Sequence, residues 1–146
     1  MTMETVRQWL RESDEPWTRY RTRLDLDGRP PDDPAVQADR AAMLAHPDIR
    51  QLTDAAAAWP GYALKRHSDA GHPLHAFSTL TDFGLTAADP GLAEPVERIL
   101  AHQSPAGAFE TLLHIPTAFG GPGEDRWAWM ACDAPVPLYT LVALGL

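Results

Sequence analysis

The sequence predicts an all-α fold built from helical hairpins. Apolar residues recur at spacings of three and four between His72 and Phe109, and no stretch keeps the alternation of a strand. Pro73 suits the first turn of a helix, and Gly84 suits its left-handed end. Part of this pattern returns 61 residues later, because STLTDFGL (78–85) aligns with YTLVALGL (139–146). Repeated helix pairs of this kind indicate a stacked or ring-closed helical architecture.

The expected elements fill one α-helical domain, residues 1–146, with N-terminal helices in 1–60 and helix-pair repeats in 61–146. Prolines, glycines and capping residues predict helices over residues 3–12, 16–24, 34–44, 49–59, 73–83, 91–102 and 134–146. Asp89 and Asp133 are expected to cap the last two of these helices. The segment 62–71 reads as a loop, 110–119 is too short to assign, and 127–132 fits either a helical turn or an extended insert.

Composition excludes several classes of protein. The 146 residues are 45% hydrophobic, which is enough for a packed core, and the net charge of −8 argues against a nucleic-acid binder. The single cysteine cannot form an intramolecular disulfide and fits a reducing compartment. No apolar run approaches the ~20 residues of a membrane span. We therefore expect a soluble cytoplasmic protein without a membrane span.

A loop motif of the type Gln-x-x-x-Gly-x-aromatic follows the central helix pair, at Gln103, Gly107 and Phe109. With the 61-residue offset and the opening segment 9–36, it makes the chain resemble the terpenoid cyclase and prenyltransferase-repeat proteins, in particular uncharacterised bacterial members. The resemblance implies an α/α-toroid whose inner helices line a central cavity, here as an incomplete, N-terminal portion. It also implies a structural role for the motif, in which Phe109 replaces the tryptophan of that family.

The catalytic motifs of that family are not matched. Class II cyclases use Asp-x-Asp-Asp, whereas Asp25-Leu26-Asp27-Gly28 lacks the last carboxylate, and prenyltransferases hold zinc with Asp, Cys and His, whereas Cys132 and Asp133 give two candidates at most. We therefore predict a non-catalytic or catalytically degenerate module that binds an apolar small molecule or a partner protein. The alternative is part of a cyclase- or prenyltransferase-like enzyme acting on a prenyl or other apolar substrate. A third possibility, a carbohydrate-active α/α barrel, needs a pair of carboxylates that the sequence does not single out.

Two groups of residues are candidates for lining a ligand cavity. His75, Thr79 and Asp82 lie at i, i+4 and i+7 on one helix, where they face either a cavity or solvent. The second group precedes the last helix, where aromatic, thiol and carboxylate side chains converge: Trp129, Cys132 and Asp133. Helix capping is the simpler role for Asp133.

Histidines and basic residues suggest two further kinds of site, for a metal ion and for a diphosphate. The histidines at 67, 72 and 75, with Asp69 and Asp82 nearby, suggest a metal site, but their spacing matches no ligand pattern, and capping or surface roles are favoured. We expect no metal and no cofactor. The basic residues form two groups, Arg19, Arg21 and Arg23, and Lys65, Arg66 and His67. The two groups could hold a diphosphate if they came together, although ion pairs with acidic residues are favoured.

The last helix, residues 134–146, is apolar on nearly every side. Such a helix must be covered. We expect it to be buried by self-association or by a continuing chain.

Overall fold

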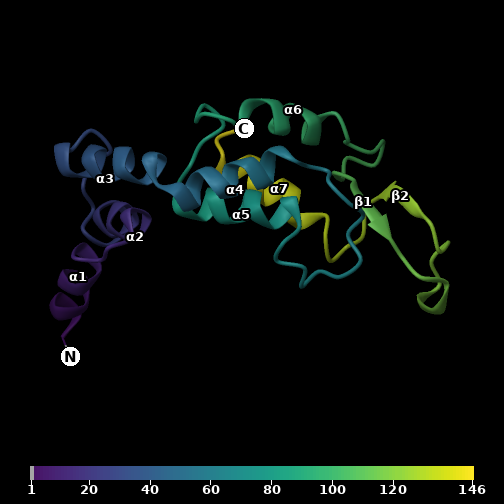
Figure 1. Ribbon diagram of the computed structural model, residues 1–146, viewed down its shortest axis with the longest axis horizontal. Coiled ribbons are helices and arrows are strands. Elements are labelled where there is room, and N and C mark those ends of the chain that lie inside the picture. Colours follow the sequence, from purple (N-terminus) through teal and green to yellow (C-terminus); the bar gives the residue numbers. More distant parts are fainter. Residues whose placement is uncertain (1) are drawn as a thin grey trace. The chain divides into compact units, whose positions relative to one another are not determined.

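The computed structural model describes residues 2–146, which contain seven α-helices and one two-stranded antiparallel sheet (Figure 1). The chain forms two compact units, Met1–Gln51 and Leu52–Leu146. The elements in chain order are α1 Met3–Arg11, α2 Pro16–Arg21, the π-helical turn Thr22–Leu26, α3 Pro34–Ala45, α4 Pro47–Ala57, α5 Pro73–Phe83, α6 Ala93–Leu100, β1 Thr111–His114, the 3-10 turn Thr117–Phe119, β2 Asp125–Ala128 and α7 Pro135–Ala143.

The predicted all-α class of toroid type is wrong, because β1 and β2 make the fold mixed α/β, although the sheet is small. Thr111 lies opposite Ala128, and His114 lies opposite Asp125. Each strand has only four residues, which is too short for an alternating pattern to stand out. The strands also pair across a turn-rich connection, so their partners are not visible in local sequence.

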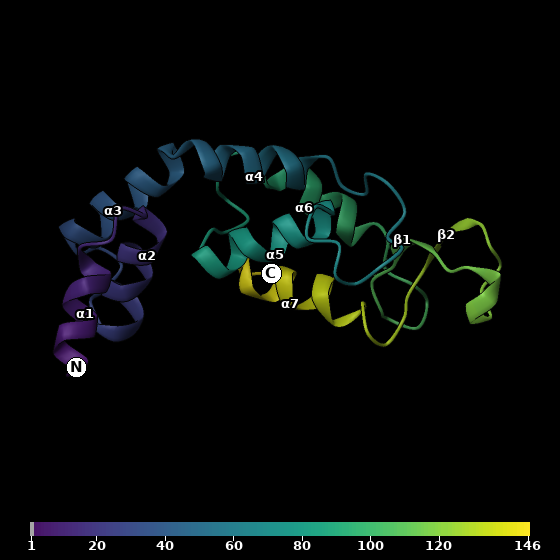
Figure 2. The ribbon, with the colours of Figure 1, turned by 60° about the horizontal axis from the view of Figure 1, so that its bottom comes forward.

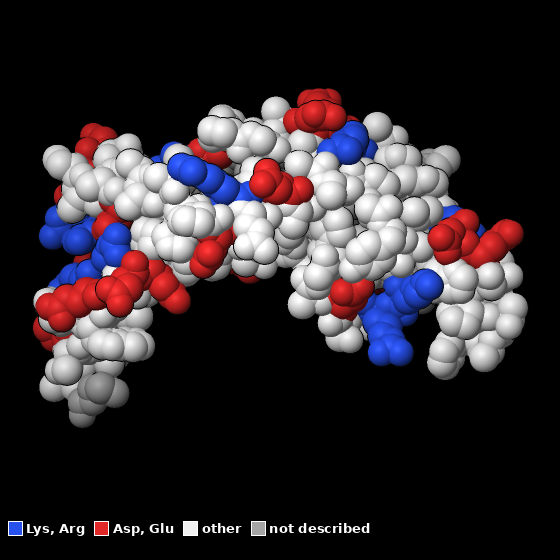
Figure 3. All heavy atoms as spheres, viewed as in Figure 1, with Lys and Arg blue, Asp and Glu red and all other residues white. Residues whose placement is uncertain are grey.

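The first unit is held together by α2 and α3. Tyr20, Val36 and Met43 form its apolar interior. The Asp33 side chain begins α3 by accepting hydrogen bonds from the backbone N–H groups of Ala35 and Val36. On the face that Figure 3 shows, acidic and basic side chains lie close to one another on this unit.

The second unit is centred on α5 and α7, which lie side by side in both ribbon views (Figures 1 and 2). Their buried side chains, together with those of neighbouring segments, form the core: Leu74, Phe77, Leu80, Leu92, Val96, Ile99 and Leu141. The hydroxyls of Ser78 and Thr140 lie 3.3 Å apart where the two helices meet. The two copies of the sequence repeat are thus packed against each other.

Both copies end in the same cap. Gly84 and Gly145 have φ values of 94° and 97°, which a residue with a Cβ adopts only with strain. The N–H of Leu85 donates to the carbonyl of Leu80 at 3.1 Å, and the N–H of Leu146 donates to the carbonyl of Leu141 at 3.1 Å. These are the six-residue hydrogen bonds of a Schellman cap, so the repeat encodes helix termination.

Two predicted helix starts are corrected. The sixth helix begins at Ala93, and Asp89 does not cap it, because its carboxylate accepts hydrogen bonds from the N–H and hydroxyl of Thr86. The last helix has Ala134 at its N-cap position and no side-chain cap, so Asp133 is not its capping side chain either.

One face of α7 is exposed. Large apolar side chains remain accessible there at Leu138 and Val142, and Leu146 is also exposed just beyond the end of the helix. The expectation that another chain covers this face stays a prediction. Among residues 2–146, no helix has both the length and the apolar character needed to cross a bilayer.

Candidate functional site

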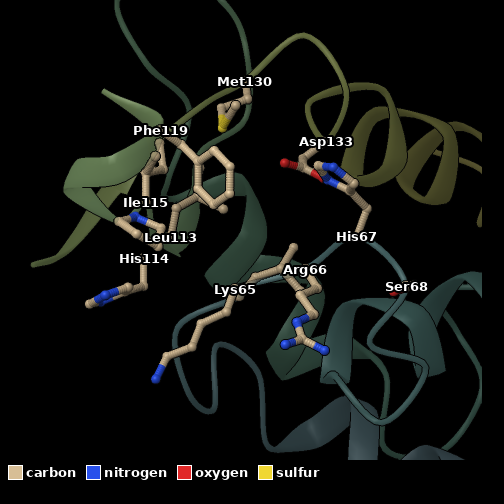
Figure 4. Close-up of a pocket in the computed structure, with 12 residues that line it drawn as sticks. Lys65, Arg66, His67, Ser68, Leu113, His114, Ile115, Phe119, Met130 and Asp133 are labelled. Atoms are coloured by element: carbon tan, nitrogen blue, oxygen red, sulfur yellow. The ribbon is translucent and has the colours of Figure 1, made fainter. Parts of the chain in front are cut away.

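A cavity of about 370 Å³ lies in the second unit (Figure 4). One wall is apolar and the opposite edge is polar, where the His67 ring meets the Asp133 carboxylate. Its lining comprises Leu64, Lys65, Arg66, His67, Ser68, Leu113, His114, Ile115, Pro116, Phe119, Met130 and Asp133. Phe119 is 82% exposed, so its side chain is accessible to a bound molecule.

The segment that follows α4 is attached to the edge of β1. The N–H of Leu64 donates to the carbonyl of Leu112 at 2.8 Å, and the N–H of His114 donates back to the carbonyl of Leu64 at 3.1 Å. This short parallel bridge fixes the residues that follow it. It therefore brings Lys65, Arg66 and His67 to the cavity, although the sequence suggests only a loop there.

Asp133 reaches the cavity from the turn that joins β2 to α7. Backbone hydrogen bonds from the N–H groups of Asp133 and Ala134 to the carbonyl of Met130 form this turn. Asp133 is buried, with 6% of its surface exposed. Its carboxylate binds neighbouring side chains and caps no helix end, so the simpler reading offered by the sequence is wrong.

Three potential ligands meet at the polar edge. Nδ1 of His67 lies 3.1 Å from Oδ1 of Asp133, and the Cys132 thiol donates to Oδ2 of Asp133 at 3.4 Å. One donor atom from each of the three residues lies within 4.8 Å of the other two. The site thus combines an imidazole, a thiol and a carboxylate from two segments that are distant in sequence.

The thiol is not activated as a nucleophile. Loss of hydration, and then the hydrogen bond to Asp133 and the charge of that carboxylate, raise the pKa of the Cys132 thiol above its ordinary value. The thiolate is the reactive form of cysteine, so the raised pKa disfavours attack by Cys132.

Lys65 and Arg66 supply positive charge to the same cavity. Figure 4 shows their charged ends directed away from the Asp133 carboxylate. Both residues are exposed, and within residues 2–146 neither side chain forms an ion pair. They are therefore available to an anionic group of a ligand.

His72, the second of the three histidines considered for a metal site, has a structural role. His72 is fully buried and begins α5 by accepting a hydrogen bond from the N–H of Leu74, while its Nε2 donates to the carbonyl of Tyr62 at 2.9 Å. Both of its ring nitrogens are occupied, which leaves none for a metal. Asp69 accepts a hydrogen bond from the hydroxyl of Tyr62 at 2.7 Å.

The predicted stripe on α5 does not line this cavity. Thr79 donates its hydroxyl to the carbonyl of His75 at 2.9 Å, and the Tyr139 hydroxyl donates to Asp82 at 2.5 Å. The Nε2 of His75 is buried and has no hydrogen-bond partner among the described residues. Trp129 is half-exposed and also lies outside the cavity lining.

The loop motif forms a compact turn. The Gln103 side-chain amide donates to the carbonyl of Gly107 at 2.9 Å, and Gln103 and Phe109 face each other in an antiparallel bridge. Gly107 has a φ of 89°, and Phe109 is buried. In this arrangement the three residues shape the backbone between α6 and β1.

The three arginines of the first unit that were considered for a diphosphate site are engaged in ion pairs. Arg19 and Arg23 bind opposite oxygens of Asp39 at 2.7 and 2.6 Å. Arg21 pairs with Asp25 at 2.8 Å, so none of these arginines is held ready for a diphosphate.

Asp27, the second carboxylate of the Asp-Leu-Asp-Gly segment, is also paired. It accepts two hydrogen bonds from Arg11, which lower the pKa of its carboxyl group. A protonating acid needs the opposite shift.

Sequence reasoning named Cys132 and Asp133 but did not join them to His67. His67 lies 66 positions before Asp133 in the chain, and the pairing of Leu64 with β1 brings the two residues together. The same pairing brings together two segments that line the cavity, residues 64–68 and 113–116. The sequence signal that points to His67 is the polar run Lys65-Arg66-His67. It directly follows the apolar residues Ala63 and Leu64, which are buried.

No protein-family model matches the chain, and comparison with curated proteins and with solved structures finds no match either. The resemblance to terpenoid cyclase and prenyltransferase-repeat proteins therefore remains a hypothesis from sequence.

Proposed function

We propose that the second unit is a binding module for a small, mainly apolar molecule that carries an acidic group. The cavity carries this proposal. Its volume of about 370 Å³ lies near the lower end of the roughly 300–1,000 Å³ typical of ligand pockets, which favours a small ligand. Leu113, Ile115 and Phe119 provide the apolar contact surface on one wall.

The charge around the cavity supports an acidic group on the ligand. Lys65 and Arg66 lie at its rim without internal ion-pair partners among the described residues. An anionic group placed between them would gain charge-assisted hydrogen bonds. The protein as a whole carries a net charge of −8, so the positive charge at this cavity is opposite in sign to the net charge of the chain.

Binding of 1-anilinonaphthalene-8-sulfonate, an apolar aromatic sulfonate, tests the proposal. Phe119→Ala should raise its Kd by roughly tenfold, because covering an exposed aromatic ring contributes on the order of 1–2 kcal/mol. Leu138→Ala is the matched control, since Leu138 is exposed on α7 and lies outside the cavity. Equal affinity for all three proteins would contradict the proposal.

A second comparison tests the acidic group. Lys65→Gln combined with Arg66→Gln should weaken binding of the sulfonate but leave binding of uncharged Nile red nearly unchanged. Mass spectrometry of molecules extracted from the purified protein would then identify the natural ligand.

A cytoplasmic location, inferred from the single cysteine, remains part of the proposal.

A further inference from the structure

We propose that His67, Cys132 and Asp133 form a binding site for a zinc-like divalent cation at the polar edge of the cavity. The donor set favours this class of ion. Imidazole and thiolate suit Zn²⁺, whereas Mg²⁺ and Ca²⁺ prefer oxygen ligands alone. The thiolate and the carboxylate together carry two negative charges, which balance those of the ion.

The spacing of the donor atoms fits tetrahedral coordination. Bond lengths of about 2.0 Å to nitrogen and oxygen and about 2.3 Å to sulfur place neighbouring ligand atoms roughly 3.3–3.6 Å apart. Nδ1 of His67 lies 3.1 Å from Oδ1 of Asp133, and Sγ of Cys132 lies 3.4 Å from the other oxygen, Oδ2. With one donor atom taken from each residue, the three atoms lie within 4.8 Å of one another. A modest side-chain adjustment therefore brings them around one ion.

The three residues also differ from an ordinary surface cluster. Asp133 is buried, and its two oxygens are directed at His67 and Cys132 by the turn that precedes α7. His67 and Cys132 are exposed, so an ion can enter from solvent. On binding, the thiol proton leaves to solvent as the metal–sulfur bond forms. The imidazole proton, which Nδ1 donates to Asp133 in the metal-free protein, is lost from Nδ1 and a proton is regained on Nε2, so that Nδ1 binds the ion.

Three protein ligands leave one tetrahedral position for water or for a ligand. His67 and Asp133 both line the cavity, so this position is accessible to a molecule bound there. The site thereby extends the proposed ligand-binding role, but its own evidence is the geometry of the three donors. This inference revises the expectation from sequence that the protein binds no metal.

Titration of the chelator-treated full-length protein with Zn²⁺, with its thiol kept reduced, tests the site. We expect one ion per chain, and we expect His67→Ala and Cys132→Ser each to raise the Kd by more than about 100-fold, since loss of even an outer-shell partner costs about 10–100-fold. Both side chains are exposed, so these variants should fold, which circular dichroism checks. Mg²⁺ should not compete.

His114→Ala is the matched control. His114 also lines the cavity and pairs with an aspartate, Asp125, at 2.7 Å. It is not part of the group formed by His67, Cys132 and Asp133. Its loss should change the Zn²⁺ affinity by less than about twofold. Equal effects of His114→Ala and His67→Ala, or no effect of either Cys132→Ser or His67→Ala, would overturn the proposal.

Substitution with Co²⁺ gives an independent spectroscopic readout. Tetrahedral coordination should produce intense visible ligand-field bands, and Cys132→Ser should abolish the thiolate-to-cobalt charge-transfer band. Phe119→Ala should weaken binding of the aromatic sulfonate but leave the Zn²⁺ affinity unchanged. Failure of the metal site and failure of the organic-ligand site can therefore be told apart.

Discussion

The Nε2 of His72 donates to the carbonyl oxygen of Tyr62 at 2.9 Å, which holds a neutral imidazole in the core of the second unit. Burial is the main cause of a lowered pKa for His72, the positive charge of a protonated His75 adds to it, and the Tyr62 hydrogen bond and Asp69 oppose it. The folded protein therefore resists protonation that the unfolded chain accepts.

This lowered pKa predicts a loss of stability in mild acid. The contribution of His72 to stability should be constant above its unfolded pKa of about 6.5. It should fall as the pH drops from there towards the folded pKa, by up to about 1.4 kcal/mol per pH unit. Chemical denaturation between pH 8 and pH 5 measures the slope. His72→Asn keeps a side chain suited to the N-cap but cannot titrate, so its slope should be smaller; an identical slope would contradict the prediction.

Gly107 should be required for the loop between α6 and β1. Its φ of 89° strains any residue with a Cβ, so Gly107→Ala should destabilise the protein by roughly 1 kcal/mol. Gly71→Ala is the control, because Gly71 lacks a positive φ and a Cβ there would make only ordinary contacts at 3.5 Å and beyond. Equal unfolding free energies for the two variants would refute the role of Gly107.

Asp39 should be important for the first unit. It is buried between Arg19 and Arg23, and its removal leaves two partly buried guanidinium groups without their shared partner. Asp39→Ala should cost about 2 kcal/mol in urea denaturation. Asp25→Ala removes the exposed pair with Arg21 and should cost no more than about 0.5 kcal/mol. A similar cost for both variants would show that burial adds nothing to the Asp39 pairs.

The exposed face of α7 should promote self-association. Leu138 and Val142 are 53% and 61% exposed, and both are apolar. Light scattering after size-exclusion chromatography should detect a dimer or larger species, which Leu138→Asp combined with Val142→Asp converts to monomer. Trp9→Asp, at an exposed apolar position on α1, should leave the larger species intact. A monomeric wild-type protein at high concentration would contradict this prediction.

Local sequence determines most helix boundaries, because the interactions that set them span only a few residues. Asp33 caps the helix that follows it, Pro73 begins α5 and Gly84 ends it, each as its neighbours in the chain dictate. The 61-residue repeat has the same local basis, because both copies end a helix at a glycine with positive φ, Gly84 and Gly145.

Tertiary structure alone decides the sheet and the candidate site. Four-residue strands have no stable conformation until they pair, and the partner of β1 is set by packing and not by its own residues. Asp133 shows the same limit. Its position before a proline-rich helix predicts a cap, yet the pairing of Leu64 with β1 places His67 beside its carboxylate. A hydrogen bond between residues 66 positions apart forms only when the intervening chain has folded, so no local sequence pattern can predict it.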